Sequence, residues 1–177
     1  MDLDGYRAGL GSPIGHAAGE PLGLDLIKAA IEAQSVSLRP GDILMLHTGW
    51  CEWFLSLATK EKQRIRDSRR ATGVAQSQEF VAWAWDNRLA VIAADTFAVE
   101  CLPVVPDSPF AASAPNDHGM MHQQLLAKLG MPLGELWQLG PLARHMNTTG
   151  NWDAFVTIKP LNITGGTGSP ANATALT

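Results

Sequence analysis

Two short apolar runs on either side of an amphipathic segment constrain the fold more than any other feature of this sequence. ILMLHTGW (43–50) and AVIAADT (90–96) begin with continuous apolar residues, as buried strands do. Between them, SQEFVAWAWDNRLA places Phe80, Ala84 and Leu89 at helical spacing. A strand, a helix and a second strand in succession are typical of a βαβ unit. We therefore expect a mixed α/β fold with helices packed on a sheet.

Other segments predict further elements, but the first 23 residues predict none. Residues 1–23 hold six glycines and two prolines without an apolar period, so they are expected to be irregular chain. Asn116 or Asp117 would cap a helix over 118–129, which Gly130 would end. Shorter signals predict a helix near 24–34, a helix from Pro141, a half-exposed strand in 152–160 and a glycine-rich loop after it. Only about three or four strands result, against ~5–6 in a typical sheet.

Length and charge limit the kind of protein and the kind of partner. The 177 residues, 46% of them hydrophobic, suit one domain spanning 1–177. The net charge is −4, and acidic residues interrupt the one basic run, KEKQRIRDSRR (60–70), which predicts a solvated helix face or loop and no nucleic-acid partner. No apolar run approaches a membrane span, and no signal peptide is recognisable. Cys51 and Cys101 lie in unlike settings and form no disulfide framework, so we expect a cytoplasmic protein.

A histidine pair is the main candidate for chemistry. On a helix, His118 and His122 would share one face about 5–6 Å apart, close enough to hold one metal ion. Zinc sites of this spacing need a third ligand, often a carboxylate, and Glu135 lies beyond the turn GMPLG. The alternative is that both histidines are surface residues and that Glu135 begins the next helix. Spacing alone leaves both interpretations open.

Other candidate residues carry weaker signals. GGTGSP (165–170) can bring backbone amides to an anion, but it lacks the P-loop and dinucleotide-binding patterns and is equally compatible with a plain turn. Asp95 ends a strand, where it can be functional or can cap a turn. Cys51 has no basic neighbour to activate it, which favours a packed thiol. Trp50 and Trp137 can line an apolar pocket or belong to the core.

Four segments, in order, resemble a known family: PGDILMLHTGW, AVIAADTFAVE, HQQLLAKLGMPLGELWQLGPLA and PLNITGGTGSP. They are similar to the C-terminal half of the cyclase family of metal-dependent hydrolases, which includes the bacterial kynurenine formamidases of tryptophan catabolism. The resemblance spans about residues 24–176. It implies a swivelling β/β/α fold, a site for zinc or another divalent metal such as manganese, a small-molecule amide or carbonyl substrate, and assembly into dimers or higher oligomers.

The resemblance also implies which residues hold the metal. In the family, a histidine ahead of a Leu-Leu pair and a glutamate about a dozen residues later are ligands, and these positions match His122 and Glu135, with one extra residue between them here. His118 has no counterpart in the family pattern and stays an alternative. The H-x-G-T-H-x-D motif of the N-terminal half is absent, and His16 does not match it. Where the family commonly has arginine before TGW, this chain has His47.

These departures shape the functional expectation. Two ligands are fewer than the three plus water that catalytic zinc requires, so the chain is expected to be the later portion of such a fold, incomplete at its N-terminus. We expect an arylformamidase-like hydrolase. The alternative is a non-catalytic remnant or partner module of the same fold. A sheet with few strands leaves edges open, so we also expect a homo-oligomer, most simply a dimer, with 43–50 or 90–96 near the contact.

Overall fold

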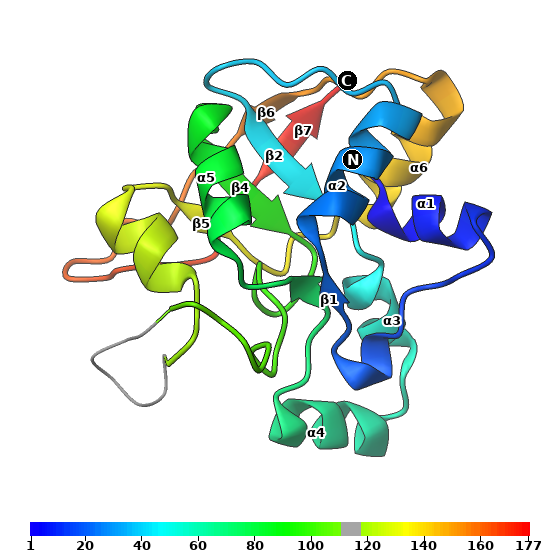
Figure 1. The fold of residues 1–177 in the computed structure, drawn as a ribbon, viewed down its shortest axis with the longest axis vertical. Helices are drawn as coiled ribbons and strands as arrows, with labels where there is room; N and C mark the ends of the chain where they lie inside the picture. The colour runs from blue at the N-terminus through cyan, green and yellow to red at the C-terminus, as the bar shows by residue number, and fades with distance from the viewer. Residues whose placement is uncertain (111–117) are drawn as a thin grey trace.

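A three-stranded parallel sheet in the order β2-β4-β5 forms the centre of the fold (Figure 1). The structure, a computed structural model, describes residues 1–110 and 118–177. The strands of the central sheet are β2 (Ile43–Leu46), β4 (Val91–Ala94) and β5 (Leu133–Gly134). The helix α5 (Gln78–Asp86) precedes β4, which pairs in parallel with β2, so the mixed α/β class is confirmed.

Shorter elements surround this sheet. Two strand pairs flank it: parallel β1 (Pro21–Leu22) with β3 (Gly73–Val74), and antiparallel β6 (Phe155–Thr157) with β7 (Thr174–Leu176). The remaining helices are α1 (Leu3–Gly9), η1 (His16–Ala18), α2 (Leu24–Ala33), α3 (Trp50–Ser56), α4 (Thr59–Ser68), η3 (Gln123–Lys128) and α6 (Gly140–Thr149). The described residues thus contain seven strands. The prediction of three or four is wrong because two-residue strands are too short to show a period.

The core lies where α2 and α5 pack on one face of the sheet (Figure 1). Ile27 of α2 and Phe80 of α5 are fully buried against Leu46 and Ile92 of the strands. β4 is the central strand, and its residues Ile92 to Ala94 have no exposed surface. A contact between two copies near 43–50 or 90–96 stays a prediction.

The sequence predicted irregular chain for the first 23 residues, but the structure shows regular elements there. Asp2 caps α1 by accepting a hydrogen bond from the Gly5 N–H at 2.9 Å, and Leu3 is completely buried in the core. Residues 16–18 and 21–22 add a turn of 3₁₀-helix and the strand β1. Long-range contacts stabilise these short elements, so local glycine content misled the prediction.

The helix predicted over residues 118–129 is shorter and wound differently. The structure shows the π-helix η3 over Gln123–Lys128, with His118 in a turn before it. Gly119 has a φ of 83°, which interrupts any right-handed helix, so His118 and His122 do not share a helical face. Gly130 follows the helix with a φ of 64°, as predicted for a helix end. The predicted caps Asn116 and Asp117 lie outside the described residues.

The other predicted elements are confirmed with adjusted limits. The basic run forms α4, of which only Ile65 is buried, and α6 has Pro141 in its first turn. Exposure alternates along 152–159, as expected for a half-exposed strand, although only 155–157 pair with β7. Residues 158–173 form a largely exposed loop. Within the described ranges, no helix combines the length and apolarity needed to cross a membrane.

Candidate metal site and its supporting carboxylates

Polar side chains gather where the parallel strands of the central sheet end. His47 and Thr48 follow β2, Asp95 follows β4, and Glu135 follows β5. The carboxyl ends of neighbouring parallel strands lie at one edge of a sheet, where ligands of open α/β folds usually bind. These four candidate residues therefore lie at the same edge of the central sheet, where its parallel strands end.

His122 and Glu135 lie together, as the sequence predicted. His122 Nε2 is 3.0 Å from Glu135 Oε1, although thirteen residues separate the two in the chain. His122 is the N-cap residue directly before η3, and Glu135 directly follows β5, so a helix start and a strand end bring them together. Each is partly exposed, which leaves the pair accessible from solvent.

Glu100 completes this group, although no pattern in the sequence pointed to it. One carboxylate oxygen contacts His122 Nδ1, so the imidazole is held between two carboxylates. The same carboxylate accepts hydrogen bonds from the backbone N–H groups of Met121 at 2.8 Å and His122 at 3.1 Å. Its side chain is 1% exposed, and the Gln76 amide donates a further bond to it at 2.8 Å. Glu100 thus fixes both the ring and the backbone at the start of η3.

The two carboxylates control the protonation of His122. Burial alone would lower its pKa, but the hydrogen bonds to Glu100 and Glu135 raise the pKa to about 9. Without a metal, the ring is therefore doubly protonated at neutral pH and forms an ion-paired cluster. If a metal replaced the Nε2 proton, the Nδ1–H group would still donate its hydrogen bond to Glu100. This arrangement orients metal-binding histidines in many proteins.

The residues present fit part of a metal site. An imidazole nitrogen and a carboxylate oxygen at 3.0 Å are ligand types that zinc binds, with a buried carboxylate behind the histidine. His118, the alternative ligand, is exposed in the turn before η3. Among residues 1–110 and 118–177, no three His, Cys, Asp or Glu side chains are placed to hold one metal ion. At this place the described residues thus offer one imidazole and one accessible carboxylate, fewer than the three protein ligands of a catalytic zinc site.

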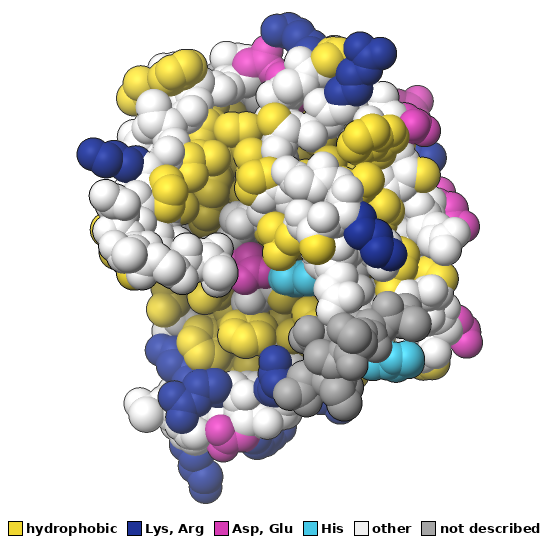
Figure 2. All heavy atoms as spheres, turned by 90° about the vertical axis from the view of Figure 1, so that its left-hand side faces the viewer, with side chains coloured by type: hydrophobic (Ala, Val, Ile, Leu, Met, Phe, Trp, Pro, Cys, Tyr) yellow, Lys and Arg dark blue, Asp and Glu magenta, His cyan; other side chains and the backbone are white. Residues whose placement is uncertain are grey.

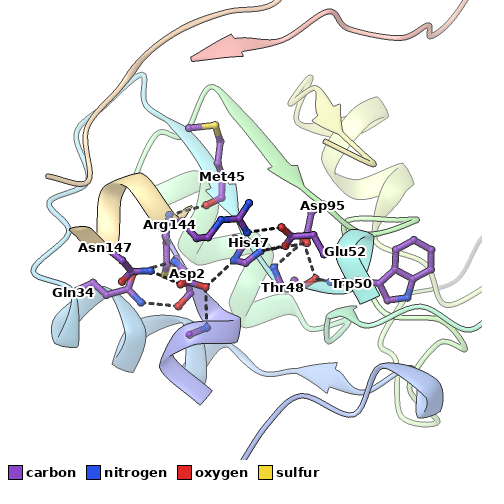
Figure 3. A network of polar contacts seen from close by, with 12 residues as sticks. Asp2, Gln34, Met45, His47, Thr48, Trp50, Glu52, Asp95, Arg144 and Asn147 are labelled. Carbon is purple, nitrogen blue, oxygen red and sulfur yellow. Dashed lines mark hydrogen bonds and ion pairs between the residues drawn. The ribbon is translucent and has the colours of Figure 1, made fainter. Parts of the chain in front are cut away.

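A second histidine, His47, is held between carboxylates in the same way (Figure 3). Its Nδ1 is 2.8 Å from Asp2, and its Nε2 is 3.0 Å from Glu52 and 3.9 Å from Asp95. Arg144 of α6 binds Glu52 at 2.7 Å, which links this group to the helix. The His47 side chain is only 9% exposed.

Three carboxylates surround His47 and outweigh its burial. Burial would lower the pKa of His47, but the hydrogen bonds with Asp2 and Glu52 and the charge of Asp95 raise it to about 9. For Asp2, burial acts to raise the pKa, and the bonds from His47 and its neighbours lower it overall. His47 therefore carries a positive charge at neutral pH.

Asp95, which follows β4, binds the backbone just beyond the end of the neighbouring strand β2. It is fully buried, and its Oδ1 accepts hydrogen bonds from both the backbone N–H and the hydroxyl of Thr48 at 2.7 Å. Of the two interpretations of the strand-ending aspartate, the structure thus shows the capping contact. Its Oδ2 is buried without a hydrogen-bond partner in the described residues, 3.9 Å from His47 Nε2.

A groove of about 990 Å³ opens beside Glu135. Leu136, Trp137 and Leu142 are among its apolar lining residues, and residues 168–175 of the C-terminal segment line it as well. Figure 2 shows a hollowed face on which apolar side chains gather on both sides of a histidine and an acidic side chain. Trp137 therefore lines a groove, whereas Trp50 is 4% exposed and belongs to the core.

The two cysteines and the GGTGSP stretch contribute less to the candidate site. Burial raises the pKa of the Cys51 thiol, which fits a packed thiol and not a nucleophile. Both cysteines are free. Residues 168–170 of GGTGSP line the groove beside Glu135, and residues 165–168 are exposed.

A family model and a solved structure both match this chain. The family model named Cyclase matches residues 13–101, just over half of the chain. A crystal structure of a protein described as a novel cyclase matches with a TM-score of 0.81 and 29% sequence identity, over 99% of this chain and 52% of that chain. This chain thus spans about half the length of that relative. The matched region begins before residue 24, the predicted limit. No curated protein matches significantly.

Proposed function

Because the chain belongs to the cyclase family, we propose that it is a metal-dependent hydrolase that cleaves an amide or formamide C–N bond in a small molecule. The observation that carries this proposal is the placement of His122, whose Nδ1 is held by buried Glu100 and whose Nε2 meets Glu135. Such a triad holds a ligand nitrogen in one orientation. The chain spans about half of its relative, so further ligands would come from polypeptide beyond these residues.

His122 and Glu135 would hold the metal, zinc or another divalent ion such as manganese. When bound, this metal supplies a Lewis acid that polarises a carbonyl and lowers the pKa of a coordinated water to about 7. Glu100 keeps the proton on Nδ1, so that the Nε2 lone pair of His122 faces Glu135. Because the pKa of His122 is about 9, metal uptake at neutral pH must release its Nε2 proton.

The groove beside Glu135 suits the apolar part of an amide substrate. Trp137 and Leu142 line the same groove as Glu135 and offer apolar contact to a substrate. An aryl or alkyl group in this groove would bring its amide carbonyl toward the His122–Glu135 pair. Aromatic side chains at such positions hold flat apolar groups through burial and ring contact. An arylformamide is therefore the substrate class that we propose.

A non-catalytic module of the same fold is the second candidate. It is favoured by one observation: both ring nitrogens of His122 are paired with carboxylates, of Glu100 and Glu135, without any ligand. In that case, His122 would act as a structural cation that joins η3 to the end of β5. The two candidates differ in whether metal displaces the Nε2 proton.

A zinc titration of the purified chain separates these candidates. We expect weak zinc binding with release of a proton, at least about tenfold weaker binding for His122→Ala and Glu135→Gln, and unchanged binding for the control His118→Ala. Formate release from an N-formyl aromatic amine, measured with zinc present, tests the reaction itself. Zinc held equally well after His122→Ala would contradict the proposed ligands, and a chain that takes up no zinc and releases no proton would favour the module.

We also propose that the chain forms a homodimer through the β6–β7 pair. Phe155 and Leu176 are directly paired across these strands and are 67% and 59% exposed. Exposed apolar pairs of this kind mark interaction surfaces. Light scattering behind a sizing column should show a dimer, and Phe155→Asp should give a monomer, whereas Thr59→Asp at an exposed position of α4 should not. A monomeric parent chain would refute this assembly. The cytoplasm remains the proposed compartment.

A further inference from the structure

Leu136, which directly follows Glu135, has an unusual backbone conformation. Its φ is 55°, in the left-handed region that L side chains rarely adopt. In this region the Cβ atom comes too close to the following carbonyl oxygen, a contact that glycine avoids. In the described part of the chain, four other residues besides glycines have a positive φ, and their side chains are all polar: Ser35, Arg69, Arg88 and Asn172. A leucine in this conformation therefore requires an explanation.

Backbone hydrogen bonds hold Leu136 in this conformation. Its N–H donates to the Thr96 carbonyl at 3.0 Å, and the Trp137 N–H donates to the Ala94 carbonyl at 3.2 Å. These bonds tie the turn that follows β5 to the end of β4, directly beside Glu135. The turn therefore requires a residue in the left-handed conformation at position 136, but it does not require an apolar side chain there.

Burial does not explain the leucine side chain either. Leu136 is 52% exposed, so folding of the chain removes only part of its apolar surface from water. Glycine or asparagine would adopt the same turn at a lower steric cost. The leucine side chain instead lines the groove of about 990 Å³ that Glu135 and Trp137 also line. Strained residues of this kind occur mainly at sites that contact a ligand.

We propose that Leu136 is a specificity-determining residue of this groove, and that its side chain packs against the aryl or alkyl group of the amide. This inference rests on the proposed function, to which it adds the contact that selects an apolar substrate. Trp137 is fixed beside it, because a Cβ on Gly134 would lie 2.7 Å from indole carbons of Trp137. Both residues follow directly on Glu135, so an apolar group in contact with them lies beside a candidate metal ligand.

Binding of formanilide, a small N-formyl aromatic amide, tests this role without turnover. The dissociation constant is measured by NMR titration of the whole chain in the absence of metal. Leu136→Asn keeps the left-handed turn but removes apolar surface, whereas Leu136→Met keeps an apolar side chain of similar size. The control Leu10→Asn changes a leucine at the end of α1 that is 62% exposed, has a φ of −83° and does not line the groove.

We expect Leu136→Asn to weaken formanilide binding by about fivefold or more, because the bound aryl group loses apolar contact. Leu136→Met and the control Leu10→Asn should stay within about twofold of the parent chain. Thermal unfolding should change in the opposite direction: Leu136→Asn should melt about 2 °C or more above the parent, because the backbone strain is relieved. A variant that is more stable but binds more weakly has not lost affinity through damage to the fold.

Formanilide that bound Leu136→Asn as tightly as the parent, or that did not bind the parent, would overturn this proposal. Loss of a dimer in Leu136→Asn with unchanged affinity would also overturn it, since the leucine would then contact a second copy. Formate release with zinc present tests the reaction separately. Binding that depends on Leu136 without formate release would support the role of Leu136 and contradict the proposed hydrolysis.

Discussion

Replacing Glu100 by alanine is expected to lower the free energy of unfolding by about 3–5 kcal/mol, because it removes one partner of a buried ion pair. The carboxylate accepts bonds from the Met121 and His122 backbone, the His122 ring and the Gln76 amide, and all of these donors would lose their acceptor. A loss of this size is a large fraction of the ~5–15 kcal/mol that holds a domain folded.

Urea unfolding of the Glu100 variants measures this effect. The control Glu79→Ala removes an exposed carboxylate from the first turn of α5 and should change stability little. Glu100→Gln, which keeps the size but not the charge, should fall between the two. If Glu100→Ala cost no more than Glu79→Ala, the buried carboxylate would not organise the start of η3 as described.

Replacing His47 by leucine should have a similarly large effect, with a distinct dependence on pH. Asp2, which is buried, and Glu52 would both lose their cationic partner, at a cost of about 3–5 kcal/mol near neutral pH. The control His145→Leu changes an exposed histidine of α6 and should be close to neutral.

The sign of the pH dependence follows from the raised pKa. Burial acts to lower the pKa of His47, but its carboxylate partners raise it from 6.5 to about 9. Between these values the folded state binds more protons, so the stabilisation by His47, about 3 kcal/mol, is complete below pH 6.5 and is lost by about pH 9. His122 has a similar pKa and contributes in the same window.

Unfolding measured from pH 6 to 9.5 therefore tests this account. Parent stability should fall across this range, and His47→Leu should show a clearly smaller fall, because the contribution of His47 is removed while that of His122 is kept. The lowered pKa of Asp2 acts at the other end, where stability is lost as the pH falls toward acid. Identical slopes for parent and variant would mean that His47 is neutral in the folded chain.

The sequence predicted the elements whose signals are local. The apolar runs of β2 and β4 and the spacing of Phe80, Ala84 and Leu89 in α5 are each read within about a dozen residues. His122 and Glu135 could be paired because a turn alone separates their elements. The family resemblance then singled them out, and the structure places them 3.0 Å apart.

The supporting carboxylates could not be predicted in this way. Glu100 stands among buried residues 22 positions before His122, and Asp2 lies 45 positions before His47, so only the folded chain brings them together. Glycine-rich composition hid the helix α1, which depends on the burial of Leu3. Gly119, with its positive φ, removed the helix that would have joined His118 to His122. Long-range packing decided each of these cases.

The most direct test of the central claim is the position of a bound metal in a crystal of the chain grown with zinc. An anomalous difference map should show zinc in contact with His122 Nε2 and the Glu135 carboxylate, with Glu100 still on Nδ1, and no such peak in His122→Ala. Zinc at His118 or at the His47 group, with the His122–Glu135 contact unchanged, would contradict the account.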